Sequence, residues 1–115
     1  MELLTHRNEN KTKEYTYYIK DGEKVKHGLC RDWSITGHLY HEGYYKDGKA
    51  HGLIRSWYEN GQLEGKLNYK DGERHGFCRN WEFNGKLELE IYYWEGVKYE
   101  SQEAYEESLI ANKSW

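Results

Sequence analysis

The sequence has no proline and few of the aliphatic residues that usually fill a protein core. A scarcity of Leu, Ile, Val and Phe is by itself typical of a disordered chain. Yet the 115 residues include 12 tyrosines and 5 tryptophans, and disordered chains contain few aromatic residues. The 12 glycines, without any proline, suit tight turns between regular strands. We therefore predict one folded domain whose apolar surface is largely aromatic.

Other features are also absent, and each absence excludes a class of function. The formal net charge is −3, so no basic balance indicates nucleic-acid binding. No apolar run reaches the roughly 18 residues of a membrane span, and the first residues lack the apolar stretch of a signal peptide. We expect a cytoplasmic protein, or one in the host cytosol if the chain is viral. With no catalytic triad pattern, phosphate-binding loop or nucleotide fingerprint, we expect neither an enzyme nor a cofactor.

The chain repeats itself with a period of 24 residues, which is the signature of a repeat architecture. Five types of residue recur at this spacing: His27, His51 and His75; Arg31, Arg55 and Arg79; Trp33, Trp57 and Trp81; Tyr45, Tyr69 and Tyr93; Gly48, Gly72 and Gly96.

Within each unit, apolar residues at odd positions alternate with polar residues at even positions, which is typical of a strand with one apolar face. A three-residue loop at 59–61 would place Trp57 opposite Leu63, and a five-residue loop at 47–51 would place Tyr45 opposite Leu53. The matching loop of the first unit, at 21–27, is two residues longer, which preserves the alternation. The pattern predicts a mainly all-β, elongated, single-layer antiparallel meander of hairpins, with every tryptophan on one face.

Three segments follow from this pattern. Residues 1–14 form a polar N-terminal arm, and residues 15–99 contain three repeats and the start of a fourth. Residues 100–115 form a C-terminal helical cap, in which Ser101 is the N-cap and Tyr105 and Leu109 share one face.

The string Tyr-x-x-Gly-x-x-x-Gly, from Tyr45 to Gly52 and again from Tyr69 to Gly76, resembles the MORN repeat. The longer string from Gly52 to Leu63 is more similar to the variant MORN repeat of bacterial antitoxin-like proteins and some large viruses. The resemblance implies a fold of β-hairpin repeats and a role as an interaction scaffold. It also implies two further roles found in the family, lipid binding and action as an antitoxin component.

Arginine, tryptophan and tyrosine dominate interface hot spots, and all three recur in this chain. We predict a partner-binding surface on one sheet face, formed by Arg31, Trp33, Arg55, Trp57, Arg79, Trp81, Tyr45, Tyr69 and Tyr93. The alternative is that each arginine stem simply packs on the aromatic side chains.

The recurring histidines and the two cysteines have simpler interpretations than a metal site or a disulfide. Equivalent residues of neighbouring hairpins lie two strands apart, on the order of 10 Å, which is too far for shared zinc coordination. We therefore predict that the histidines close turns and that no metal is bound. Cys30 and Cys78 lie two repeats apart and are expected to be reduced, small apolar residues on the even face.

The leading hypothesis is a small module that binds another protein through the aromatic and arginine face, or through the acidic segment 82–107. Two alternatives stay open. One is a neutraliser, either an antitoxin or a viral inhibitor of a host defence protein. The other is binding of lipid headgroups, which the negative net charge and the lack of a polybasic cluster disfavour, so membrane association is not expected. Edge strands would also permit a homo-oligomer.

Overall fold

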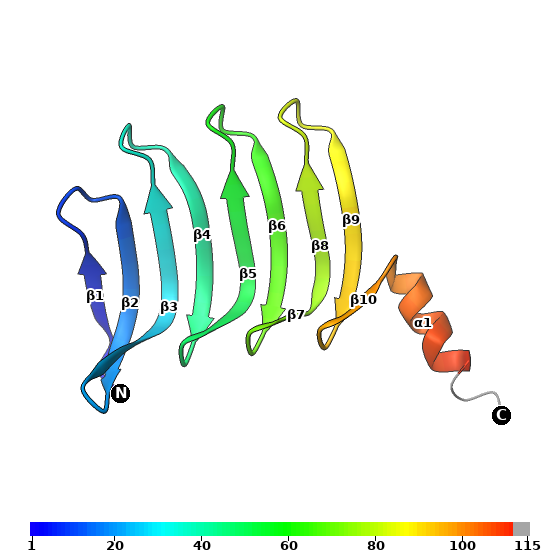
Figure 1. Cartoon of the computed structure of the whole chain (residues 1–115), viewed down its shortest axis with the longest axis horizontal. Helices are drawn as coiled ribbons and strands as arrows, with labels where there is room; N and C mark the ends of the chain where they lie inside the picture. Colours follow the sequence, from blue (N-terminus) through cyan, green and yellow to red (C-terminus); the bar gives the residue numbers. More distant parts are fainter. Residues whose placement is uncertain (112–115) are drawn as a thin grey trace.

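The computed structural model describes residues 1–111 as one open antiparallel sheet followed by a helix (Figure 1). The strands are paired in chain order, which confirms the predicted meander; β7 pairs only with β6. The molecule measures 58 × 42 × 13 Å, so the sheet is a single layer. The strands are β1 (Leu4–Arg7), β2 (Lys13–Lys20), β3 (Glu23–Trp33), β4 (Leu39–Lys46), β5 (Lys49–Trp57), β6 (Leu63–Lys70), β7 (Glu73–Arg74), β8 (Gly76–Trp81), β9 (Leu87–Trp94) and β10 (Val97–Tyr99).

The lower turns in Figure 1 are shorter than the sequence pattern suggested. Asp47 and Gly48 form a two-residue turn with φ values of 50° and 84°, the left-handed geometry that matches the twist of a hairpin. As a result Tyr45 pairs with Ala50, and the predicted pairing of Tyr45 with Leu53 is wrong.

The first repeat has the same type of turn, at Asp21 and Gly22. The two additional residues of this repeat lie in the strand and not in the turn: β3 has 11 residues, and its counterpart β5 has 9. The prediction of a longer loop at 21–27 is therefore wrong.

The upper turns in Figure 1 confirm the predicted pairing of Trp57 with Leu63, and Gly61 is left-handed with a φ of 86°. The next pair joins Ser56 to Gly65, which leaves Glu64 as an extra residue. This is a β-bulge, and it shifts every later residue of β6 to the opposite face. Tyr40 and Glu88 occupy the same position in the neighbouring hairpins, so the shift recurs along the sheet.

The bulges divide the apolar residues between two faces, so the prediction of a single apolar face is wrong. The arginine face carries Arg31, Arg55 and Arg79, together with Trp33, Trp57 and Trp81, which take equivalent pairings in their hairpins. The tyrosine face carries Tyr45, Tyr69 and Tyr93, together with Cys30, Ile54 and Cys78.

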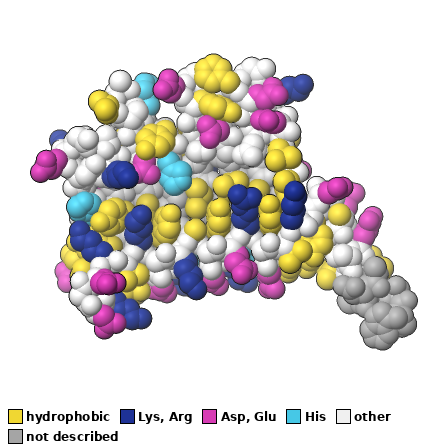
Figure 2. All heavy atoms as spheres, in the orientation of Figure 1, with side chains coloured by type: hydrophobic (Ala, Val, Ile, Leu, Met, Phe, Trp, Pro, Cys, Tyr) yellow, Lys and Arg dark blue, Asp and Glu magenta, His cyan; other side chains and the backbone are white. Residues whose placement is uncertain are grey.

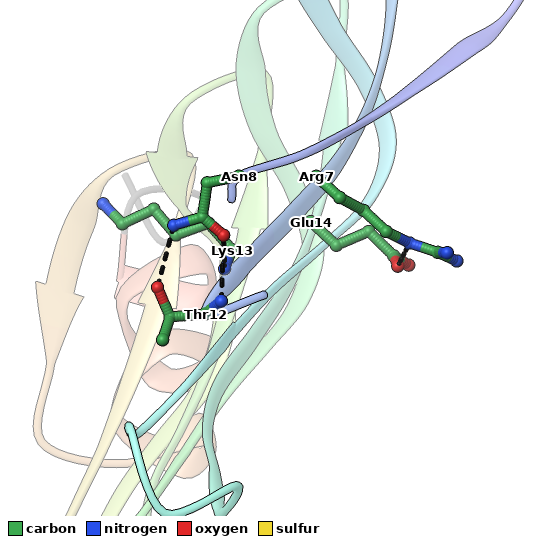
Figure 3. A network of polar contacts seen from close by, with 5 residues as sticks. All are labelled: Arg7, Asn8, Thr12, Lys13 and Glu14. Carbon is green, nitrogen blue, oxygen red and sulfur yellow. Dashed lines mark hydrogen bonds and ion pairs between the residues drawn. The ribbon is translucent and has the colours of Figure 1, made fainter. Parts of the chain in front are cut away.

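The N-terminal segment, predicted to be a polar arm, contributes an edge strand to the sheet. Strand β1 pairs with β2, and Leu4 lies opposite Tyr17. The Asn8 side chain closes the connecting turn by accepting hydrogen bonds from the amides of Thr12, at 2.8 Å, and Lys13, at 2.9 Å (Figure 3). This turn lies outside the 24-residue pattern, which explains why the periodicity did not reveal the strand.

Helix α1 (Gln102–Ala111) begins as the sequence predicts, because the Ser101 hydroxyl accepts a hydrogen bond from the Ala104 amide at 3.0 Å. Tyr105 packs against the sheet, but Leu109 is 42% exposed, so only one of the two residues predicted to cap the sheet does so. The predicted cap extends to residue 115, and its last residues, 112–115, lie outside the described part of the chain. No helix within residues 1–111 has the length and hydrophobicity required to cross a membrane.

The single layer leaves very little interior. In the described residues the only buried hydrophobic side chains are Cys30, Cys78 and Tyr92, and Glu42 is the one buried charged side chain. Stability must therefore come mainly from cross-strand pairs and from contacts between neighbouring hairpins.

Candidate functional site

A row of charged side chains crosses the arginine face from one end of the sheet nearly to the other. Its members pair directly from strand to strand, and directly paired residues point to the same side of a sheet. The first pair, Arg7 and Glu14, is visible as an ion pair in Figure 3. The charged row consists of Arg7, Glu14, Arg31, Glu42, Arg55, Lys66, Arg79 and Glu90.

Glu42 is the central anion of the charged row. Its carboxylate accepts hydrogen bonds from Arg31 Nε at 2.8 Å and from Arg55 Nη2 at 2.6 Å, and its side chain is only 11% exposed. The hydrogen bond from Arg31 lowers the pKa of Glu42, and that from Arg55 adds to the effect, while burial opposes both. Glu42 thus holds the arginines of two neighbouring hairpins in place.

Two of the three arginines also lie over aromatic rings, which agrees with the alternative that the arginine stems pack on the aromatic side chains. The Arg55 guanidinium lies 5.4 Å from the centre of the Trp57 ring, and that of Arg79 lies 4.5 Å from the Phe77 ring. Arg79 also pairs with Glu90 at 2.6 Å. These contacts fix the orientation of the side chains, while the tryptophans and arginines stay only half-buried.

Lys66 interrupts the alternation of charge in this row. It occupies the repeat position of Glu42 and Glu90, and it lies directly opposite both Arg55 and Arg79. Within residues 1–111 no carboxylate lies at ion-pair distance from Lys66. Glu42 and Lys66 were not among the predicted site residues, although Glu42, Lys66 and Glu90 recur in the sequence at intervals of 24 residues.

Two tyrosines of the arginine face occupy equivalent positions in the repeat but differ in environment. Tyr44 lies opposite Leu29 and is 52% exposed. Tyr92 lies opposite Phe77 and is only 7% exposed, because Tyr105 of α1 and Tyr99 of β10 cover it. The arginine face therefore buries an aromatic ring where another element lies on it and leaves the equivalent ring open elsewhere.

Tyr45, Tyr69 and Tyr93, which were predicted to belong to the partner-binding surface, lie on the tyrosine face. The arginines and tryptophans of that predicted surface lie on the arginine face. On the tyrosine face, cations stack on the rings: Lys26 lies 5.3 Å from Tyr45, and Arg74 lies 5.3 Å from Tyr93. Figure 2 shows this face as a band of hydrophobic side chains interrupted by Lys and Arg. The prediction that these tyrosines share a site with the arginines is wrong because each bulge shifts the tyrosine to the opposite face.

The recurring histidines join neighbouring hairpins. The Nδ1 atoms of His27, His51 and His75 accept hydrogen bonds from turn amides 20 residues further along, at 3.1, 3.3 and 3.0 Å. They close turns, as predicted, but the turns belong to the next repeat. In residues 1–111 no group of three or more potential ligands is placed to hold a metal ion.

Cys30 and Cys78 are free and buried on the tyrosine face, where Ile54 takes the same position in the middle repeat. Burial raises the pKa of the Cys30 thiol. Their predicted role as small apolar residues is confirmed.

The tips of the upper turns pack unequally. Tyr58 donates a hydrogen bond to the Trp81 carbonyl at 2.7 Å, and Asn60 Nδ2 donates one to the Phe83 carbonyl at 3.1 Å. Ser34 and Thr36 occupy the positions of Tyr58 and Asn60 in the preceding turn. These smaller residues border a hollow of about 570 Å³ between the two tips, next to Trp57.

Comparison with known proteins agrees with this geometry. Residues 50–71, which form most of the β5–β6 hairpin, match the model of the MORN repeat variant. No curated protein and no solved structure shows a significant match to the chain.

Proposed function

We propose that this chain, which carries a MORN repeat variant at residues 50–71, is a binding module that receives a partner protein on its arginine face. MORN repeats are generally non-catalytic modules for interaction with proteins or membranes. The arginine face supplies the residue types that dominate protein interfaces, held in fixed orientations on a single-layer sheet.

The contrast between Tyr44 and Tyr92 carries the proposal. Tyr92 shows what this face does when an element of the same chain lies on it: the ring is buried between Phe77 and Tyr105. Tyr44, beside Leu29, offers an equivalent ring without a cover. An exposed aromatic surface on a sheet with no second layer is typical of an interaction site.

The test compares capture of partners by the wild-type chain with capture by Tyr44→Ser and by a matched control. The control is Ile19→Ser, because Ile19 lies on the tyrosine face and its 53% exposure is nearly that of Tyr44. Both side chains are open, so neither change should unfold the protein, which circular dichroism would verify.

Proteins captured from a lysate of the native source would be identified by mass spectrometry. We expect the Tyr44→Ser chain to lose a specific partner that the Ile19→Ser chain retains. Retention of every partner by Tyr44→Ser, or an equal loss in both variants, would contradict a site on the arginine face.

A further inference from the structure

The interruption of the charged row at Lys66 indicates what this surface binds. We propose that Arg55, Lys66 and Arg79 form a site for a carboxylate side chain from an acidic peptide segment of the partner. The inference rests on the proposed function and names the chemistry of the partner at one point of the arginine face.

The strand register brings three cationic side chains together. Lys66 lies opposite Arg55 on β5 and opposite Arg79 on β8, so three cationic side chains stand side by side on three adjacent strands. Side chains directly opposite each other have Cβ atoms only about 5 Å apart, and like charges at that distance repel. The arrangement is unfavourable for the isolated chain and becomes favourable when an anion lies above it.

The two arginines are both oriented away from Lys66. Arg55 turns its guanidinium toward Glu42, and Arg79 turns its guanidinium toward Glu90, so both bind carboxylates on the sides away from Lys66. Lys66 is left with no carboxylate of its own within residues 1–111. The charged row has five cations and three anions, and this surplus of positive charge contrasts with a net charge of −3 for the chain.

The repeat itself indicates the chemistry of the ligand. At positions 42 and 90 a glutamate supplies the anion, and at position 66 the repeat lacks it. A carboxylate brought by another protein would restore the alternation of charge, as the Glu42 carboxylate does between Arg31 and Arg55. Trp57 and Phe77, on which the two arginines stack, border the site and would contact neighbouring side chains of the peptide.

The test uses Lys66→Glu, which would place the missing carboxylate within the chain and occupy the site. The matched control is Lys46→Glu, which makes the same change in net charge at a lysine that also faces another cation, Lys49, but at a turn. A second variant, Lys66→Met, removes the cation without adding an anion. The probe is a fluorescein-labelled peptide of ten glutamates, and its binding is followed by fluorescence anisotropy at low salt.

We expect the wild type and Lys46→Glu to bind the peptide alike. Lys66→Met should weaken binding, and Lys66→Glu should weaken it about tenfold or more, since it replaces attraction with repulsion at a close charge pair. No binding by the wild type, or equal losses in Lys66→Glu and Lys46→Glu, would overturn the proposal. Binding to vesicles containing phosphatidylserine without binding to the peptide would also overturn it, in favour of a lipid headgroup.

Capture of the partner by the variants distinguishes a failure of this inference from a failure of the proposed function. If Tyr44→Ser loses that partner and Lys66→Glu keeps it, the arginine face is the binding surface but the carboxylate site is wrong. If neither variant loses it and the peptide still depends on Lys66, the site binds acidic peptides but the partner docks elsewhere.

Discussion

Arg55 and Lys66 lie directly opposite each other on β5 and β6, with their positive charges on the same face of the sheet. Lys66 also lies opposite Arg79, whereas every pair of the charged row that does not include Lys66 joins an arginine to a glutamate, as Arg31 is joined to Glu42. The sheet therefore retains a repulsive pair at the centre of the surface that we propose for binding. Like charges directly opposite each other are destabilising, so we expect the folded chain to be less stable with Lys66 than with a glutamate at this position.

The first prediction concerns the loss of stability that we expect from these like charges. Lys66→Glu should increase the free energy of unfolding by about 0.5–1 kcal/mol, because it replaces like charges with opposite charges on both neighbouring strands. Urea denaturation at low salt measures the change, and added salt should reduce it. If Lys66→Glu both loses peptide binding and gains stability, then Lys66 favours binding and disfavours folding. A loss of stability would instead show that Lys66 is required by the fold.

The second prediction concerns Glu42, the buried anion shared by Arg31 and Arg55. Glu42→Gln preserves shape but removes the charge, and we expect a loss of about 1–3 kcal/mol at pH 7 because two hydrogen bonds to charged groups are weakened. Thermal unfolding of both proteins from pH 7 to pH 3 measures the difference.

The pH dependence of that difference follows from the lowered pKa of Glu42 in the folded state. The stabilisation is complete above the pKa of a glutamate in the unfolded chain, about 4.3, and is lost as the pH falls through the lower folded pKa. The two proteins should therefore approach each other in stability at acidic pH. A difference that stays constant down to pH 3 would show that the charge of the Glu42 carboxylate is not the source of the stabilisation.

The third prediction concerns the hollow between the first two upper turns. The double variant Ser34→Tyr, Thr36→Asn would copy the residues of the next turn, where Tyr58 donates a hydrogen bond to the Trp81 carbonyl. We expect a gain of about 1 kcal/mol, from one hydrogen bond and the buried ring. The control carries Ser34→Phe with the same second change, so it fills the hollow without the hydroxyl. Equal stabilities of the two double variants would exclude the hydrogen bond as a source of the gain.

The fourth prediction concerns the histidines that join neighbouring hairpins. His51 accepts a hydrogen bond from the Asp71 amide, and His51→Ala should cost about 0.5–1 kcal/mol because that acceptor is lost. His51→Asn places a carbonyl oxygen the same number of bonds from the backbone, so it should recover part of the loss. Chemical denaturation of the three proteins gives the comparison, and an equal loss in both variants would exclude a role for the acceptor.

Much of the fold was predictable because its signals are local and repeat. Gly61 lies within the turn that it determines, and Ser101 lies at the start of the helix that it caps. The 24-residue period is visible from the sequence alone. The Asp47–Gly48 dipeptide is a further local signal, because Asp-Gly is typical of a two-residue hairpin turn, and it predicts the observed turn better than the five-residue loop does. The N-terminal strand was missed because its turn has no counterpart in the repeat.

The division of the site between two faces was harder to predict. One additional residue, such as Glu64, reverses the faces of a strand but leaves the alternating pattern intact on each side of it. Because the same bulge recurs in every unit, the 24-residue period looks identical with or without it. The partnership between Arg31 and Glu42 joins different strands, and it becomes visible only once the register is known.

The central claim is that the partner lies on the arginine face. Hydroxyl-radical footprinting of the captured complex tests it directly, because Tyr44 and Trp57 lie on that face and Tyr45 and Tyr69 lie on the other. We predict that binding lowers the oxidation of Tyr44 and Trp57 and leaves that of Tyr45 and Tyr69 unchanged. Protection of Tyr45 and Tyr69, with Tyr44 and Trp57 still oxidised at their free rates, would contradict it.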